Sequence, residues 1–111
     1  MRVKTDRGEL PVHFGMNTLA TFGDEVGKSM NEVMGCLSNM GSLKLSEMLA
    51  FFYAAFKEGA FAEGEDCQVK SSRDVGVMID KDGELITKMM TAYTKQSVPE
   101  GEIEDSEGKK K

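Results

Sequence analysis

Residues 45–62 constrain the fold most strongly, because they are typical of a long helix with almost no polar face. Spacings of three and four residues predict one core-facing stripe, formed by Leu45, Leu49, Phe52 and Phe56. Further apolar side chains, among them Met48, Phe51 and Tyr53, cover the other sides of the same helix. A helix that is apolar on most sides is normally surrounded by neighbours. We expect those neighbours to be other helices of this chain or another polypeptide.

The N-terminal segment alternates apolar and polar residues with the period of a β-strand. Asp6-Arg7-Gly8-Glu9 supplies a turn in which Gly8 can adopt a positive φ. Alternation on both sides of this turn predicts a two-stranded hairpin whose buried face is formed by Val3, Leu10, Val12 and Phe14. Two strands alone are not stable in water, so the hairpin must pack on helices.

Shorter helices are predicted before and after the long one from the helical period and from helix-start signals. A serine followed three residues later by an acid marks two of these starts, at Ser29 and Ser71. The segment Asp80-Lys81-Asp82-Gly83 separates the last two predicted helices. The segment lacks the ligand spacing of a calcium-binding EF-hand loop, so we interpret it as a turn in which Asp82 caps the final helix.

The expected fold is mainly α, with an N-terminal two-stranded β-hairpin packed on a bundle of about four to five helices. These elements form one domain over residues 1–97. Residues 98–111 contain five acidic residues and a terminal lysine run, which predicts a disordered, charged tail. The expected core consists of Val12, Phe14, Leu19, Phe22, Val33, Leu37, Leu45, Leu49, Phe52, Phe56, Met78, Ile79, Leu85, Met89 and Tyr93.

Composition and charge argue against several classes of function. A net charge of −5 disfavours binding to nucleic acid, because phosphate backbones repel an acidic surface. No apolar run reaches the roughly 20 residues of a membrane span, and the charged start lacks a signal peptide, so we expect a cytoplasmic protein without membrane contact. The two cysteines and the single histidine, His13, form no metal or redox pattern. We therefore expect no cofactor, no metal and no catalytic centre.

Methionine is unusually frequent, with nine residues, whereas tryptophan is absent. Methionine side chains are flexible and suit apolar surfaces that adapt to partners, although core filling is the simpler interpretation for most of them. Phe51, Phe61 and Met90 fall outside the core stripes of their helices, so we expect them to be exposed. Together with Met48 and Tyr53 they form the predicted partner-binding residues.

Four segments define the layout of the chain: residues 10–19 (LPVHFGMNTL) and 22–27 (FGDEVG), the aromatic stretch 49–59 (LAFFYAAFKEG), and residues 74–80 (DVGVMID). A final helix and an acidic tail follow. This layout, over about residues 1–97, resembles that of the small tail assembly chaperones of long-tailed, siphovirus-like bacteriophages and prophages.

The resemblance implies a non-enzymatic protein of the host cytoplasm that acts in virion morphogenesis. Members of that family bind and shield the tape measure protein while the tail tube polymerises around it, and they are absent from the finished particle. Other tail proteins are additional partners that the resemblance leaves open. The apolar character of residues 45–62 also leaves open an association with further copies of the chain. The alternative is a small host helical adaptor or regulatory protein that binds one folded partner. A small enzyme would require a pocket that gathers His13 with carboxylates.

Overall fold

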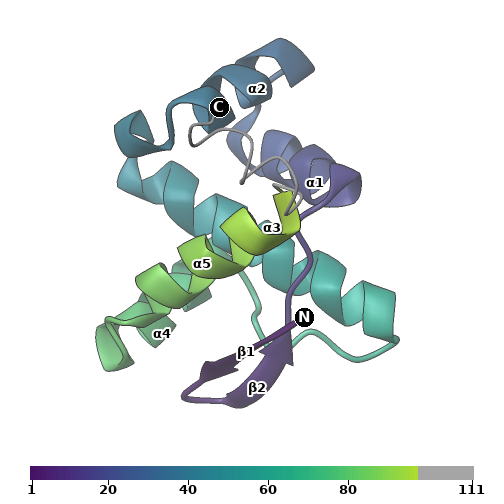
Figure 1. The fold of residues 1–111 in the computed structure, drawn as a ribbon, viewed down its shortest axis with the longest axis vertical. Helices are drawn as coiled ribbons and strands as arrows, with labels where there is room; N and C mark the ends of the chain where they lie inside the picture. Colours follow the sequence, from purple (N-terminus) through teal and green to yellow (C-terminus); the bar gives the residue numbers. More distant parts are fainter. Residues whose placement is uncertain (98–111) are drawn as a thin grey trace, which may run out of the picture.

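Helix α3 (Leu45–Glu63) runs through the centre of the computed structural model, which describes residues 1–97 (Figure 1). The other elements are, in chain order, β1 (Arg2–Thr5), β2 (Gly8–Pro11), α1 (Met16–Val26), α2 (Met30–Ser38), the short 3-10 helix η1 (Met40–Ser42), α4 (Ser72–Lys81) and α5 (Leu85–Ser97), with α3 between η1 and α4. This arrangement confirms the predicted mainly α fold with an N-terminal hairpin. The expected tail, residues 98–111, lies outside the described residues.

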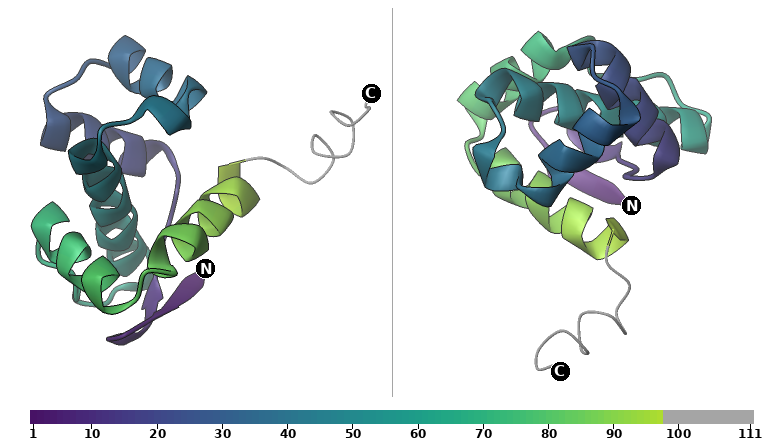
Figure 2. Two further views of the ribbon diagram at one scale, coloured as in Figure 1. Left: turned by 90° about the vertical axis from the view of Figure 1, so that its left-hand side faces the viewer. Right: turned by 90° about the horizontal axis from the view of Figure 1, so that it is seen from above.

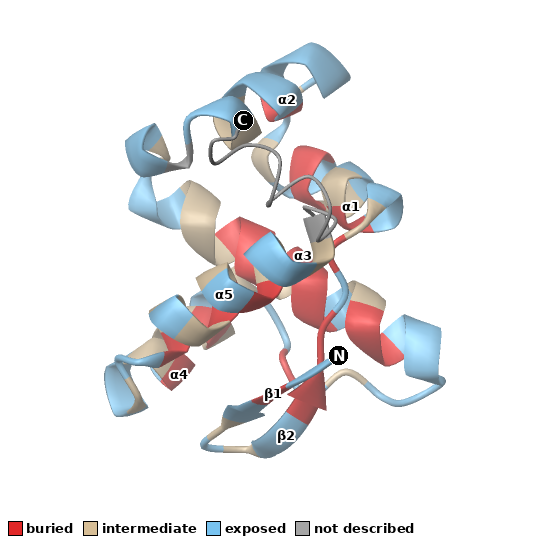
Figure 3. Cartoon of the chain, in the orientation of Figure 1, coloured by how far each residue is buried: buried red, intermediate tan, exposed pale blue. Residues whose placement is uncertain are grey.

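Helix α3 is covered by α1, α4 and strand β2, while α2 packs on α1 and α5 packs on α4 and β1. Figure 2 shows α2 at one end of the molecule and the hairpin at the other, with α3 between them. The central part of α3 is buried and most of α2 is exposed (Figure 3). The apolar long helix is therefore surrounded largely by elements of its own chain.

The hairpin is antiparallel and pairs Val3 with Leu10, both of which are buried. Its turn contains Gly8 at a φ of 100°, as the turn prediction required. Beyond β2, Val12 and Phe14 are buried, and the backbone N–H of His13 donates to the Ala55 carbonyl of α3 at 3.1 Å. The segment that follows the hairpin is thus hydrogen-bonded directly to the backbone of the central helix.

Most of the expected core is confirmed, because its members are buried or packed at the edge of the buried cluster. Leu45 is the exception, since 67% of it is exposed. It is the first residue of α3, and this end of the helix extends beyond the elements that cover the middle (Figure 3). A stripe of apolar residues predicts which side of a helix faces the core. It does not predict how far along the helix the neighbouring elements extend.

The predicted helix starts are formed by side-chain caps. The Ser29 hydroxyl accepts from the Glu32 N–H at 3.3 Å, and the Glu32 carboxylate accepts from the Ser29 N–H at 2.8 Å. At α4, the Ser71 hydroxyl accepts from the Asp74 N–H at 3.2 Å. The Asp82 carboxylate accepts from the Glu84 N–H at 3.1 Å within the turn, but Asp82 is the C-terminal cap residue of α4, so the prediction that it caps α5 is not confirmed.

An ion pair joins the hairpin turn to the start of α4. The Arg7 guanidinium donates to both carboxylate oxygens of Asp74 at 2.7 Å, and it also donates to the Gln68 carbonyl at 2.9 Å. The Lys70 N–H donates to the same carboxylate at 2.9 Å. These hydrogen bonds, those from Arg7 first, lower the pKa of Asp74 from 3.8 to about 2. The pair closes the loop between α3 and α4 against the hairpin.

Replacing Gly59 with Ala tests the contact between α3 and the segment after β2. An added Cβ would lie 2.4 Å from the Pro11 carbonyl oxygen, so the backbones must separate. We expect Gly59→Ala to lower the free energy of unfolding by about 1–3 kcal/mol in urea denaturation. Gly35→Ala, in α2, is the matched control, because nothing lies within 4 Å of its Cβ and alanine favours the helix by about 0.5–1 kcal/mol. Equal effects would contradict the close approach.

Replacing Asp74 with Asn tests the ion pair through its pH dependence. The folded-state pKa, about 2, lies below the ordinary value of 3.8, so the pair stabilises the fold above about pH 4 and loses this effect as the pH falls toward 2. We expect Asp74→Asn to cost about 1–2 kcal/mol at neutral pH. The variant should also show a shallower loss of unfolding free energy below pH 4. Asp80→Asn, an exposed site in the same helix, should keep the wild-type pH profile.

Candidate partner-binding groove

Phe51 lies at the centre of a cluster of aromatic rings. Its ring centroid is 5.2 Å from that of Phe14, 5.3 Å from that of Phe22 and 5.4 Å from that of Tyr93. These partners come from the segment before α1, from α1 and from α5, and they bury Phe51 completely. The prediction that Phe51 is exposed is therefore wrong, because α3 is covered on this side as well as along its predicted stripe.

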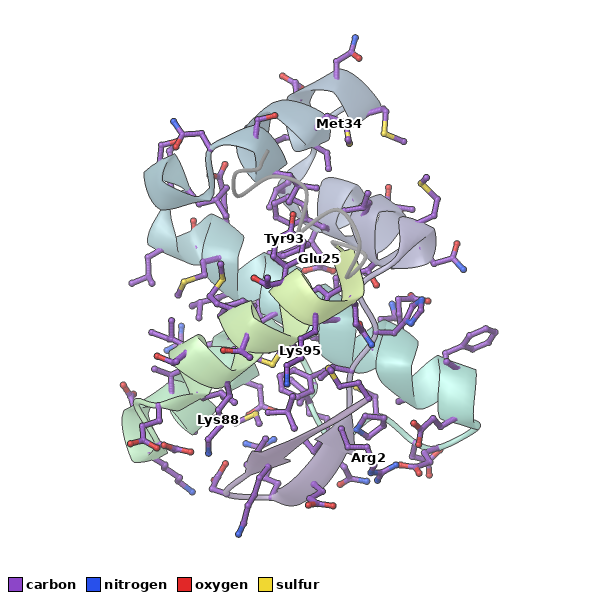
Figure 4. The ribbon with its side chains drawn as sticks, viewed as in Figure 1. Arg2, Glu25, Met34, Lys88, Tyr93 and Lys95 are labelled. Atoms are coloured by element: carbon purple, nitrogen blue, oxygen red, sulfur yellow. The ribbon has the colours of Figure 1, made fainter. Side chains whose placement is uncertain are left out.

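An open apolar groove of about 370 Å³ lies above this cluster, between α1, α2 and α5. Phe14 and Phe51 form its floor. Its walls include Met16 and Leu19 of α1, Met34 and Leu37 of α2, and Tyr93 of α5. Figure 4 shows Met34 and Tyr93 approaching the space between α2 and α5 from opposite sides. We name this feature the methionine groove.

The large apolar side chains at the rim of the methionine groove are unusually exposed to solvent. Met16 is 68% exposed and Met34 is 47% exposed, and the neighbouring Met30 of α2 is 57% exposed. Only Val33 of α2 is fully buried, so this helix presents more apolar surface than its contact with α1 covers. Exposed apolar patches next to a concave site are typical of surfaces that bind another molecule.

Polar contacts fix the segment that carries Phe14 into the floor. The Phe14 N–H donates to the Gln96 side-chain oxygen at 2.7 Å, which ties this segment to the end of α5. The buried Thr18 hydroxyl donates to the His13 carbonyl and accepts from the Gly15 N–H at 3.3 Å. Because these groups are satisfied within the protein, the floor is formed before any partner binds.

The other predicted partner-binding residues lie outside the methionine groove. Phe61 is 79% exposed, which confirms its predicted exposure, and it lies in the last turn of α3. Met48, Tyr53 and Met90 are half-buried at the edge of the core, so Met90 is less exposed than predicted. Lys57 places its Nζ 6.0 Å from the centre of the Tyr53 ring. The structure therefore does not gather the five predicted residues into one surface.

Sequence reasoning missed Met16 and Met34 as candidate binding residues. Core filling is the simpler interpretation for most methionines of the sequence, so neither residue stands out as a candidate. The usable signal lay in α2, where a helix of nine residues carries Met30, Met34 and Leu37 beside a single buried valine. So short a helix at one end of the molecule cannot bury all of them.

Residues with catalytic or metal-binding chemistry are dispersed in the described part of the chain. His13 is exposed, and Cys36 and Cys67 are half-buried free thiols. Over residues 1–97, no three histidine, cysteine or acidic side chains lie close enough together to hold a metal ion. Over the same residues, no helix combines the length and the hydropathy that crossing a membrane requires.

Comparison of the chain with models of protein families, with curated proteins and with solved structures finds no match. The features that bear on function are therefore the methionine groove and the layout of the sequence.

Truncating Phe51 and Phe61 to alanine, one at a time, compares the stability contribution of a buried floor residue with that of an exposed residue. Phe51→Ala removes the ring at the centre of the aromatic cluster, and we expect a loss of about 3–5 kcal/mol in the free energy of unfolding. Phe61→Ala should change it by less than about 0.5 kcal/mol, because the ring is largely in water. Thermal and urea denaturation of both variants measure the difference. Similar losses in the two variants would contradict the assignment of Phe51 to the floor.

Proposed function

We propose that the protein is a tail assembly chaperone that binds helical segments of a phage tape measure protein in the methionine groove. The observation that carries the proposal is an open apolar groove whose rim consists of exposed methionines and whose floor is buried aromatic rings. The resemblance of the sequence layout to tail assembly chaperones supports the same function. The protein acts by covering apolar surface of its client and needs no catalytic group.

The shape and chemistry of the groove fit an amphipathic helix. Such a helix presents apolar side chains at intervals of three and four residues, and a groove between helices accepts that stripe. Met16 and Met34 can change rotamer at little cost, so one groove accommodates client segments that differ in sequence. This tolerance suits a long client that must be covered at many places.

Charge and size explain how binding remains reversible and the complex remains soluble. Because each copy has a net charge of −5, the copies repel one another, and a client that they cover stays soluble. A groove of about 370 Å³ holds only a few side chains, so a single site binds weakly. Several copies along one client therefore shield it collectively and are released when the tail tube replaces them.

Binding to labelled helical peptides from a tape measure protein tests the proposal, with fluorescence anisotropy as the measurement. The peptides are taken from the very long reading frame that we expect just downstream of this gene. Met34→Glu places a charge on the rim, and we expect the Kd to rise at least about tenfold. Val77→Glu is the matched control, because Val77 is an exposed apolar residue of α4 that does not line the groove, and its Kd should change less than about twofold.

Two outcomes would contradict the proposal. Unchanged peptide binding by Met34→Glu would remove the methionine groove from the function. Stable one-to-one binding to a folded host protein, without affinity for tape measure peptides, would instead favour the adaptor alternative. Phe61→Glu should bind peptides as the wild type does, because Phe61 lies outside the groove.

A further inference from the structure

A second hollow, of about 300 Å³, lies between β1 and α5 and differs in character from the methionine groove. Its lining contains four cationic side chains, Arg2, Lys4, Lys88 and Lys95. Figure 4 shows Lys88 and Lys95 on the side of α5 nearest the hairpin. We name this feature the basic groove, and it is unexpected in a chain with a net charge of −5.

The cations of the basic groove are only partly neutralised by the folded domain. Arg2 pairs with Glu63 and Glu65, and Lys88 pairs with Asp82 at 3.0 Å. Within residues 1–97, neither Lys4 nor Lys95 forms an ion pair with a carboxylate. Both are exposed, so the groove retains positive charge that an acidic ligand can reach.

We propose that the acidic C-terminal segment of the same chain, Glu100–Glu107, binds in the basic groove. Five of its eight residues are acidic and none is basic. The segment begins three residues after α5 ends at Ser97, next to Lys95. Charge and position therefore identify one occupant, and this assignment replaces the expectation of a freely mobile tail.

The segment after α5 is long enough to run back along this helix to the lysines of the basic groove. Lys88 and Lys95 are seven residues apart, which is about 10 Å along a helix axis. Residues 98–107 span up to about 33 Å when extended, so they can turn and reach both lysines. Pro99 and Gly101 have the spacing of the second and fourth residues of a β-turn, which reverses the chain.

The lining of the basic groove also has a place for the one large apolar residue of the segment. Three apolar residues line the groove beside its cations: Met1, which is 45% exposed, and Val3 and Ala92, which keep only a little exposed surface. Ile103 lies between Glu102 and Glu104, so it can contact this apolar strip while the flanking carboxylates approach the lysines. Each exposed ion pair is weak, and the tether to α5 raises the local concentration of the segment enough for it to bind. Binding should accordingly be sensitive to salt.

The test uses the ¹⁵N-labelled full chain and variants of it in NMR spectroscopy. Raising NaCl from about 50 to about 500 mM should shift the amide signals of Lys4 and Lys95 and lower the heteronuclear NOE of residues 102–105. The triple variant Glu100→Gln, Glu102→Gln, Glu104→Gln should show these changes already at low salt. The double variant Lys4→Gln, Lys95→Gln should lower the heteronuclear NOE of residues 102–105 already at low salt. Lys57→Gln is the control, because this exposed lysine of α3 does not line the groove.

Wild-type and triple-variant spectra that differ only at the substituted residues and their immediate chain neighbours would overturn the proposal. Signal differences that disappear on dilution would also overturn it, because they would show binding between molecules. Neither outcome affects the test of client binding, since no residue lines both grooves.

Discussion

The burial of Phe51 among Phe14, Phe22 and Tyr93 is the contact on which the rest of the structure depends. These rings belong to the central helix, the segment before α1, α1 itself and α5. Helix α5 packs its backbone on α4 and β1, and its Tyr93 ring joins it to the central helix at this cluster. Phe14, Phe51 and Tyr93, which hold these elements together, also line the methionine groove, so stability and the candidate function share side chains.

The helices that form the walls of the methionine groove differ in how firmly they are held. Helix α1 packs directly on α3, and the hydrogen bond from Phe14 to Gln96 fixes the end of α5. Helix α2 is attached mainly through α1 and buries only Val33. Elements with few buried contacts open at lower free-energy cost than the core. A rigid floor beside a loosely held, methionine-bearing wall suits a surface that must accept varied helical segments.

The hairpin, the helices and their caps could be predicted because their signals are local. Alternation around Gly8 and the Ser29–Glu32 cap depend on residues within one turn or one pair of strands. The exposure of Leu45 and the burial of Phe51 could not be predicted in this way. A helix that is apolar on nearly all sides has no unique buried stripe, so its neighbours decide which residues are covered. The methionine groove combines residues of four helices and the segment before α1, and their meeting is a tertiary property.

Helix α5 separates two grooves of opposite character. Tyr93 and Lys95 are two residues apart, and a helix turns by about 200° over that distance, so they lie on opposite faces. One face therefore contributes the Tyr93 ring to the wall of the methionine groove, while the other presents lysines to the hollow beside β1. In the proposed arrangement, an acidic segment bound to the lysine face is kept away from the apolar face on the other side of the helix. Under the two proposals, an apolar surface binds a client and a separate groove binds the charged C-terminal segment.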